Sequence, residues 1–280
     1  MTVVLRNTFD RTNNNKGCLV VPSSLLILAV LIAGYTLMTT SISFHGEDRS
    51  QEGGGREGSS APAPYLWNGE NIYLEAANSL SPVTDKVTTH TYQIMYGKYL
   101  LPYYHQHPNM KMLEIGLGCD MGYGPGASVN LYKKLFPQAE LWEAEYDAAC
   151  VDKHRDGMLA GIHLLTGDQG NNEVLDGWIE QSGGQFDVVI DDGGHHNCMI
   201  WNSFQKLWPT VKSGGLYFIE DMQVAKAKPY RRYETTSCHK DLIVPDKLKD
   251  IVDDLIYDIK RRSDVKFIFC QSEACVLGKK

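Results

Sequence analysis

Beyond residue 65 the chain alternates short apolar runs with amphipathic segments, and this alternation limits the folds open to it. Five apolar runs are expected to form strands: residues 112–116, 140–146, 162–168, 186–192 and 215–221. The segments between them carry apolar residues at helical spacing, such as Leu175 and Trp178. Because each connection is long enough for a helix, the pattern predicts an α/β, doubly wound fold with a mostly parallel sheet covered on both faces.

Residues that commonly cap helices precede or start several of these segments. The expected caps are Ser128, Asp147, Asn172, Asn197 and Asp246. An earlier helix is expected over residues 88–104, where tyrosines recur at helical spacing. We expect this tyrosine stripe to pack in the core, with cofactor contact as the alternative.

The last segment, residues 265–279, is expected to form two strands joined by a tight polar turn. A parallel sheet that ends in such a β-hairpin gains one antiparallel strand. This combination separates a class I methyltransferase from a dinucleotide-binding Rossmann domain. We therefore expect the Rossmann-like class I fold, with a seven-stranded sheet.

The N-terminal region is expected to anchor the domain in a membrane. Residues 17–46 carry no formal charge, and residues 19–38 are long enough to span a bilayer as a helix. A basic flank before this stretch and an acidic start after it place the N-terminus in the cytosol and the domain in a lumen. The expected order is a cytosolic tail over 1–17, an anchor over 18–39, a flexible tether over 40–64 and the catalytic domain over 65–280. A cleaved signal peptide is the alternative.

Charge and cysteine content limit the kinds of partner and metal site that the chain can have. The net charge of -7 argues against a nucleic-acid partner and favours a substrate that is small or not strongly anionic. Seven cysteines without a CxxC pair indicate neither a zinc site nor a dense disulfide scaffold. Buried free thiols are expected, and a Cys270–Cys275 bridge in an oxidising lumen is the alternative.

A glycine-rich turn, LEIGLGCDMGYGPGAS, follows the first strand and contains Glu114, Gly116 and Gly118. Glycines at such a turn let the backbone approach a ligand closely, and the next helix N-terminus favours anionic groups. The third glycine of a dinucleotide fingerprint is missing, because Cys119 and Asp120 follow Gly118. The turn therefore leaves room for the methionine end of S-adenosylmethionine.

Two acidic residues at later strand ends are further candidates for cofactor contact. Glu145 is better placed than Glu143 to accept hydrogen bonds from ribose hydroxyls, although a solvated strand end beside Asp147 is the alternative. Asp168 ends the third strand, where it can contact the adenine.

Carboxylates gather after the fourth and fifth strands, in DVVIDDGGHH and IEDM. The ends of neighbouring parallel strands lie about 5 Å apart, so Asp192 and Asp221 should converge. Converging carboxylates repel one another unless a cation neutralises them, and oxygen ligands suit Mg²⁺ or Mn²⁺. The sequence predicts a metal site there, with Glu220 nearby; Asp191 is assigned to the cofactor, with helix capping as its alternative.

Two histidines follow these aspartates. His195 lies on a Gly-Gly turn and is the candidate general base, because an imidazole can take a proton near neutral pH. His196 is expected to face away from the site.

The motifs LEIG, IDDGGH and GGLYFIEDM resemble those of metal-dependent class I methyltransferases that act on macrolide sugars, the mycinamicin and macrocin O-methyltransferase group, and of related fungal proteins. The stretch SPVTDKVTTHTYQIMY, which holds Asp85, Lys86, His90 and Tyr96, resembles the segment before that core. The resemblance extends over residues 80–225. It implies that Asp192 and Asp221 bind Mg²⁺, that His195 is the base, and that Glu114, Gly116 and Glu145 hold the cofactor.

The predicted function is methyl transfer from S-adenosylmethionine, assisted by Mg²⁺ or Mn²⁺, to a hydroxyl or amine of a small molecule or secondary metabolite. Two alternatives stay open at this stage. The glycine turn also suits an NAD(P)-dependent oxidoreductase, and the fold could persist in a non-catalytic interaction protein.

Overall fold

The computed structural model describes residues 68–232, 238–239, 241–257 and 264–280. All of these fall within the second of two units in the chain, residues 63–280. The predicted tail, anchor and tether, residues 1–64, lie outside the described residues. Within the described part of the chain, no helix has the length and hydrophobicity needed to cross a bilayer.

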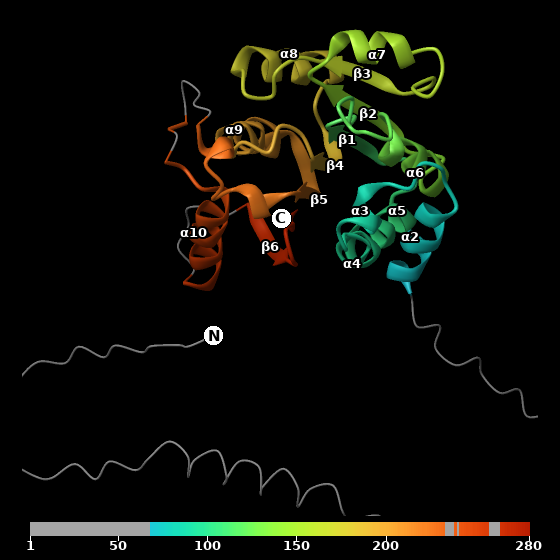
Figure 1. Cartoon of the computed structure of the whole chain (residues 1–280). Coiled ribbons are helices and arrows are strands. Elements are labelled where there is room, and N and C mark those ends of the chain that lie inside the picture. The colour runs from blue at the N-terminus through green and yellow to red at the C-terminus, as the bar shows by residue number, and fades with distance from the viewer. Residues whose placement is uncertain (1–67, 233–237, 240, 258–263) are drawn as a thin grey trace, which may run out of the picture. The chain divides into compact units, whose positions relative to one another are not determined.

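Seven strands of the described chain form one sheet (Figure 1). They are β1 (Lys111–Ile115), β2 (Glu140–Glu145), β3 (His163–Thr166), β4 (Phe186–Asp191), β5 (Val211–Ile219), β6 (Val265–Cys270) and β7 (Cys275–Lys279). Their order is β3-β2-β1-β4-β5-β7-β6, with β7 antiparallel to β5 and β6 and the other pairs parallel. The predicted doubly wound sheet and its terminal hairpin are confirmed.

Helices cover both faces of this sheet. The longer ones are α2 (Gly69–Asn78), α6 (Ala127–Leu135), α7 (Ala148–His154), α8 (Asn172–Ser182), α9 (Asn197–Leu207) and α10 (Val244–Ile256). Leu175, Phe204 and Leu248 bring α8, α9 and α10 onto one core, while Tyr73 and Leu131 bring α2 and α6 onto the other. Figure 1 shows α9 and α10 on one side of the strands and α2 to α6 on the other.

Shorter helical elements complete the chain. They are α3 (Asp85–Thr88), α4 (Gln93–Met95), the π-helical η1 (Tyr96–Leu100), α5 (Leu101–Gln106), and the 3₁₀ turns η2 (Trp208–Thr210), η3 (Met222–Val224) and η4 (Pro229–Arg231). The predicted tyrosine helix thus consists of α4, η1 and α5 in succession. Tyr92 and Tyr96 are fully buried, as expected for core packing.

Most of the predicted helix caps are wrong. Asp147 does cap α7, accepting hydrogen bonds from the amides of Ala149 and Cys150. By contrast, α6, α8, α9 and α10 are preceded by Gly126, Asn171, His196 and Ile243, not capped by Ser128, Asn172, Asn197 and Asp246.

Tertiary partners explain two of these errors. The Ser128 hydroxyl donates to Glu114, and the Asn197 side chain bonds Ala225 O and Val244 N. A short polar side chain caps a helix only when no better partner lies nearby.

The expectation of free buried thiols is also wrong. Three disulfides join described residues: Cys119–Cys150, Cys198–Cys238 and Cys270–Cys275. The first pair is separated by 31 residues along the chain. It meets because β1 and β2 are neighbours, so the segments after them leave the sheet at the same edge. Only the Cys270–Cys275 pair could be foreseen from spacing, and it is observed.

Gly116 allows the ends of β1 and β4 to approach each other at the point where the strand order reverses. Its φ is +110°, and a Cβ added there would lie 2.0 Å from the carbonyl oxygen of Asp192. Open α/β sheets bind ligands at such a reversal. The close approach therefore sets the floor of the site described next.

Replacing Gly116 with alanine should lower the free energy of unfolding by at least about 2 kcal/mol, because backbone strain and a clash add together. Gly161→Ala is the matched control, since Gly161 has φ +81° and open space around its added Cβ, and it should lose only about 1 kcal/mol. Chemical denaturation of both variants measures the difference. Equal losses would show that the contact with Asp192 is not tight.

Candidate active site

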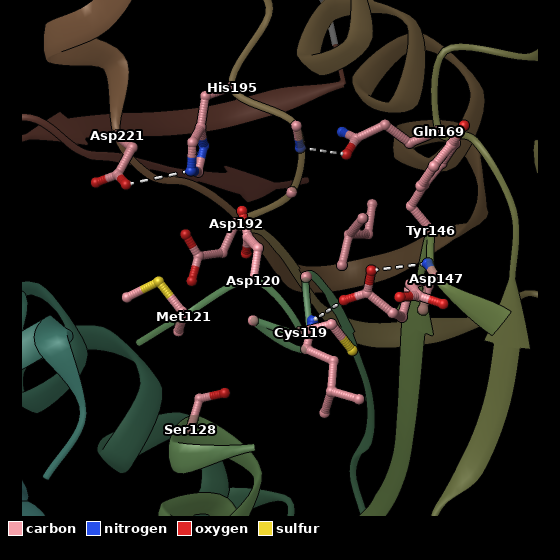
Figure 2. A pocket seen from close by; sticks show the side chains of 18 of the residues that line it. Cys119, Asp120, Met121, Ser128, Tyr146, Asp147, Gln169, Asp192, His195 and Asp221 are labelled. Atoms are coloured by element: carbon pink, nitrogen blue, oxygen red, sulfur yellow. Dashed lines mark hydrogen bonds and ion pairs between the residues drawn. The ribbon is translucent and has the colours of Figure 1, made fainter. Parts of the chain in front are cut away.

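A cavity of about 990 Å³ opens at the carboxyl ends of the central strands (Figure 2). Its walls come from the glycine-rich turn after β1, the ends of β2 and β3, and the turn over residues 192–196 after β4. A cavity of this size holds a ligand the size of a nucleoside with room beside it.

The glycine turn and Glu145 form one wall of the cavity. Gly116 and Gly118 both line it. Glu145 accepts hydrogen bonds from Leu117 N at 3.0 Å and from Asp147 N at 2.9 Å, so its carboxylate fastens the turn after β1 to the end of β2. Asp168 lines the same cavity. The structure thus brings these four predicted cofactor residues together.

Two other predicted cofactor residues, Glu114 and Asp191, are not among the described residues that line the cavity. Glu114 accepts hydrogen bonds from Ser128 at 2.6 Å and Tyr132 at 3.0 Å, beneath α6. Asp191 accepts from Gln169 and Ser203, and burial raises the pKa of its carboxyl to about 6. Direct contact with a cofactor therefore does not fit either residue, because both point into the protein interior.

The predicted metal residues do converge. Asp192, His195 and Asp221 each offer one ligand atom, and these atoms all lie within 4.8 Å of one another. The carboxylate oxygens of Asp192 and Asp221 suit a hard divalent ion such as Mg²⁺ or Mn²⁺, so these two residues fit the predicted metal. The imidazole of His195 lies beside them, in the position expected of the predicted base.

The local backbone holds these groups in an unusual conformation. His195 and Asp221 have φ values of +50° and +53°, which residues other than glycine rarely adopt. His195 Nε2 lies 3.4 Å from Asp221 Oδ2. Burial works against the charge of Asp221, but the hydrogen bond from Tyr92 and the proximity of His195 lower the pKa of this carboxyl. The lowered pKa favours the deprotonated, negatively charged form of Asp221.

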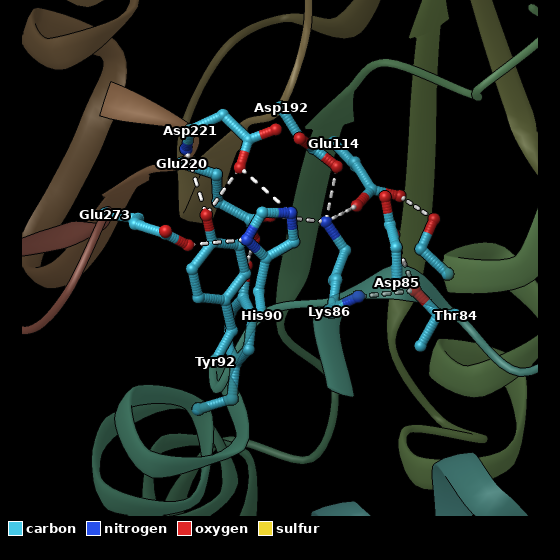
Figure 3. A network of polar contacts seen from close by, with 12 residues as sticks. Thr84, Asp85, Lys86, His90, Tyr92, Glu114, Asp192, Glu220, Asp221 and Glu273 are labelled. Atoms are coloured by element: carbon cyan, nitrogen blue, oxygen red, sulfur yellow. Dashed lines mark hydrogen bonds and ion pairs between the residues drawn. The ribbon is translucent and has the colours of Figure 1, made fainter. Parts of the chain in front are cut away.

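A buried ammonium lies beneath this cluster (Figure 3). Lys86 Nζ lies 2.5 Å from Asp192, 2.7 Å from Glu220 and 3.3 Å from Glu114, and the lysine is 1% exposed. Burial alone would lower the pKa of Lys86, but these carboxylates, Asp192 first, raise it well above its usual value. The charged lysine joins α3 to β1 and to the ends of β4 and β5.

Glu220 faces this lysine and is not one of the cavity residues. It is 1% exposed, bonded to Lys86 and to the hydroxyl of Tyr96. Burial raises the pKa of Glu220 to about 7, although Lys86 opposes the shift.

Sequence reasoning missed the roles of Tyr92 and Gln169. The Tyr92 hydroxyl donates to Asp221 at 2.5 Å and accepts from the Asp221 amide at 3.1 Å. Gln169 lines the cavity, accepts from Gly194 N at 2.8 Å and donates to Asp191. The available signal for Tyr92 was the hydroxyl that each tyrosine of the stripe carries, which needs a hydrogen-bond partner when buried. No sequence pattern indicated the role of Gln169.

His196 also departs from expectation. It was expected to face away, but it lines the cavity, where its ring lies 5.5 Å from that of Tyr230. Tyr230 belongs to η4, so this turn contributes to the cavity wall.

The strand order, the antiparallel β7 and the cavity over the glycine turn define a Rossmann-like class I methyltransferase fold. No family model matches the chain. It is nevertheless 33% identical over 170 residues to mycinamicin VI 2''-O-methyltransferase of Micromonospora griseorubida. The matched region covers 56% of this chain and 40% of that protein. The chain is 30% identical over 165 residues to demethylmacrocin O-methyltransferase of Streptomyces fradiae, or 54% of this chain and 39% of that one.

A solved structure agrees with these relatives. The methyltransferase MycE in complex with Mg, SAH and mycinamycin VI matches with a TM-score of 0.54 and 26% identity, covering 78% of this chain and 55% of MycE. The resemblance to sugar O-methyltransferases is thereby confirmed. The chain spans about 40% of the length of the curated relatives it matches.

Replacing Lys86 with methionine should lower the free energy of unfolding by about 3–5 kcal/mol, because it leaves the buried carboxylates of Glu114 and Glu220 without their cation. Lys206→Met is the control: Lys206 pairs with Asp176 at 2.7 Å on the surface, and its loss should cost no more than about 1 kcal/mol. Denaturant titration compares the two. A Lys86 variant as stable as the control would mean that the buried ammonium does not organise the site.

Proposed function

We propose that the chain is a metal-dependent O-methyltransferase that uses S-adenosylmethionine to methylate a sugar hydroxyl of a glycosylated small molecule. One observation carries the proposal: Asp192, His195 and Asp221 converge at the rim of a cavity whose opposite wall is the glycine turn with Glu145. The matched relatives are named as O-methyltransferases of mycinamicin VI and of demethylmacrocin, and the matched MycE structure holds Mg and SAH. Two further relatives, whose names include a rhamnosyl and an olivosyl group, support the sugar acceptor.

The residues divide the work between donor and acceptor. Glu145 and the glycine turn hold the nucleoside part of the donor, with the ribose against the Glu145 carboxylate. Asp192 and Asp221 hold the divalent ion. When bound, the ion orients the acceptor oxygen and lowers its pKa, and S-adenosylmethionine supplies the methyl group.

His195 then serves as the proton acceptor. The imidazole lies within 4.8 Å of a carboxylate oxygen of both Asp192 and Asp221, close enough to take a proton from a hydroxyl held between them. Asp221, 3.4 Å away, stabilises the imidazolium that forms. His196 and Tyr230 close the wall beside it and exclude water from the transfer.

Activity should depend on both metal and His195. We expect the full chain to methylate a panel of glycosylated acceptors, mycinamicin VI among them, with labelled cofactor. EDTA should abolish transfer, and His195→Ala should lower kcat by about 10²–10⁴-fold while leaving the affinity for S-adenosylhomocysteine unchanged. Full activity under both conditions would remove metal and base together, and tighter binding of NADH than of S-adenosylhomocysteine would favour an oxidoreductase.

We further propose that residues 19–38 tether the domain to a membrane and that the domain faces an oxidising lumen. The charge pattern around those residues supports the orientation. Three disulfides among the described residues support the compartment, because such bonds persist where thiols are not kept reduced.

Protease digestion of intact microsomes tests the orientation. We expect the domain to survive without detergent and to be digested with it. Mass-spectrometric mapping of the protected domain should find all three disulfides. Digestion of the domain in sealed vesicles, with free thiols at these cysteines, would reverse the assignment.

A further inference from the structure

A second acidic group approaches Asp221 from the terminal hairpin (Figure 3). His90 Nδ1 lies 2.6 Å from Glu273 Oε2, and His90 Nε2 lies 3.5 Å from Asp221 Oδ1. The imidazole therefore stands between two carboxylates, one of which belongs to the predicted metal site. The ring of Tyr92 stacks on His90 at 4.7 Å, and its hydroxyl bonds the same Asp221 oxygen at 2.5 Å.

The turn that carries Glu273 is fixed at several points. Glu273 has a φ of 72°, a left-handed conformation that needs support from its surroundings. The Cys270–Cys275 disulfide closes the turn. The carbonyl of Glu273 accepts from Met222 N at 2.8 Å, directly after Asp221. Gln271 donates to Thr91 O at 2.9 Å, directly after His90. The hairpin tip is thus attached next to both partners of the histidine.

These two residues do not form part of the cavity wall. His90 and Glu273 are absent from the described residues that line the cavity, and His90 is only 10% exposed. A direct role toward the acceptor or the donor therefore does not fit their position. They can affect the site only indirectly, through the contact of His90 with the Asp221 carboxylate.

We infer that Glu273, acting through His90, is a positioning residue that fixes the Asp221 carboxylate for binding a divalent cation. The inference rests on the proposed function and deepens it. The imidazole uses both ring nitrogens, one toward Glu273 and one toward Asp221, so Glu273 sets the orientation of the ring. Tyr92, stacked on the imidazole, donates to the same oxygen of Asp221. Partners of this kind behind a metal ligand typically contribute 10- to 100-fold to metal affinity.

The test is a Mn²⁺ titration of the full chain, with free Mn²⁺ read from its electron paramagnetic resonance signal. Glu273→Gln keeps the shape of the side chain and should weaken Mn²⁺ binding about tenfold. Binding of S-adenosylhomocysteine without metal should be unchanged, because Glu273 is not among the described residues that line the cavity with Glu145. Glu180→Gln removes an exposed carboxylate from α8 and should bind Mn²⁺ like the wild type.

A double variant tests the route through His90. If Glu273 acts only by orienting the imidazole, His90→Ala with Glu273→Gln should bind Mn²⁺ no more weakly than His90→Ala alone. Should His90→Ala not fold, Glu273→Gln alone decides. Wild-type affinity in Glu273→Gln, or additive losses in the double variant, would overturn the inference. A wild-type chain that binds no Mn²⁺ would instead refute the proposed function, and this inference with it.

Discussion

The buried ammonium of Lys86 is the constraint on which the rest of the site depends. One positive charge sits among three carboxylates, those of Glu114, Asp192 and Glu220. Lys86, Glu114 and Glu220 are each 1% exposed, and Asp192 is 20% exposed toward the cavity. Removing charges from water costs several kcal/mol for each ion unless partners compensate. A single lysine cannot neutralise all three.

This imbalance has consequences for both stability and function. The raised pKa of Glu220 shows one response, because a proton can replace a missing cation there. A divalent ion is the other response. Asp192 touches Lys86 with one oxygen and belongs to the cluster with His195 and Asp221, so the charge of a bound ion would complement that of the lysine. Asp192 thus belongs both to the buried ion pair with Lys86 and to the candidate metal site.

Backbone strain gathers at the same place. Among the described residues other than glycine, positive φ occurs at Gln185, His195, Asp221 and Glu273. Three of these belong to the candidate metal site or to the hairpin turn that supports it. Such conformations cost of order 1–3 kcal/mol each and persist only where the surroundings enforce them. Here the Gly-Gly turn, the tyrosine hydroxyls and the Cys270–Cys275 bridge supply that enforcement.

Sequence patterns predicted the sheet well, because strands that are buried on both faces appear as apolar runs. The convergence of Asp192 and Asp221 followed directly, since they leave neighbouring parallel strands. The direction in which side chains point at the strand ends was harder to predict. Asp191 and Asp192 are adjacent and point in opposite directions, but the sequence does not reveal which of them faces the cavity.

Contacts between residues far apart in the chain could not be predicted from the sequence either. Lys86 lies 106 residues from Asp192 and 134 from Glu220, and no local pattern connects them. The Cys119–Cys150 disulfide and the contact of Glu273 with His90 likewise depend on which strands become neighbours. The predicted cap at Ser128 failed because its hydroxyl donates to Glu114 on β1.

The most direct test of the account is a crystal structure of the protein with Mn²⁺ and S-adenosylhomocysteine, using the anomalous signal of the ion. We predict one anomalous peak bonded to Asp192 and Asp221, with the sulfur of the cofactor in the adjoining cavity and Lys86 still bonded to Asp192. A peak elsewhere, or an empty cluster beside a bound cofactor, would contradict the central claim that these carboxylates meet around a cation next to the methyl donor.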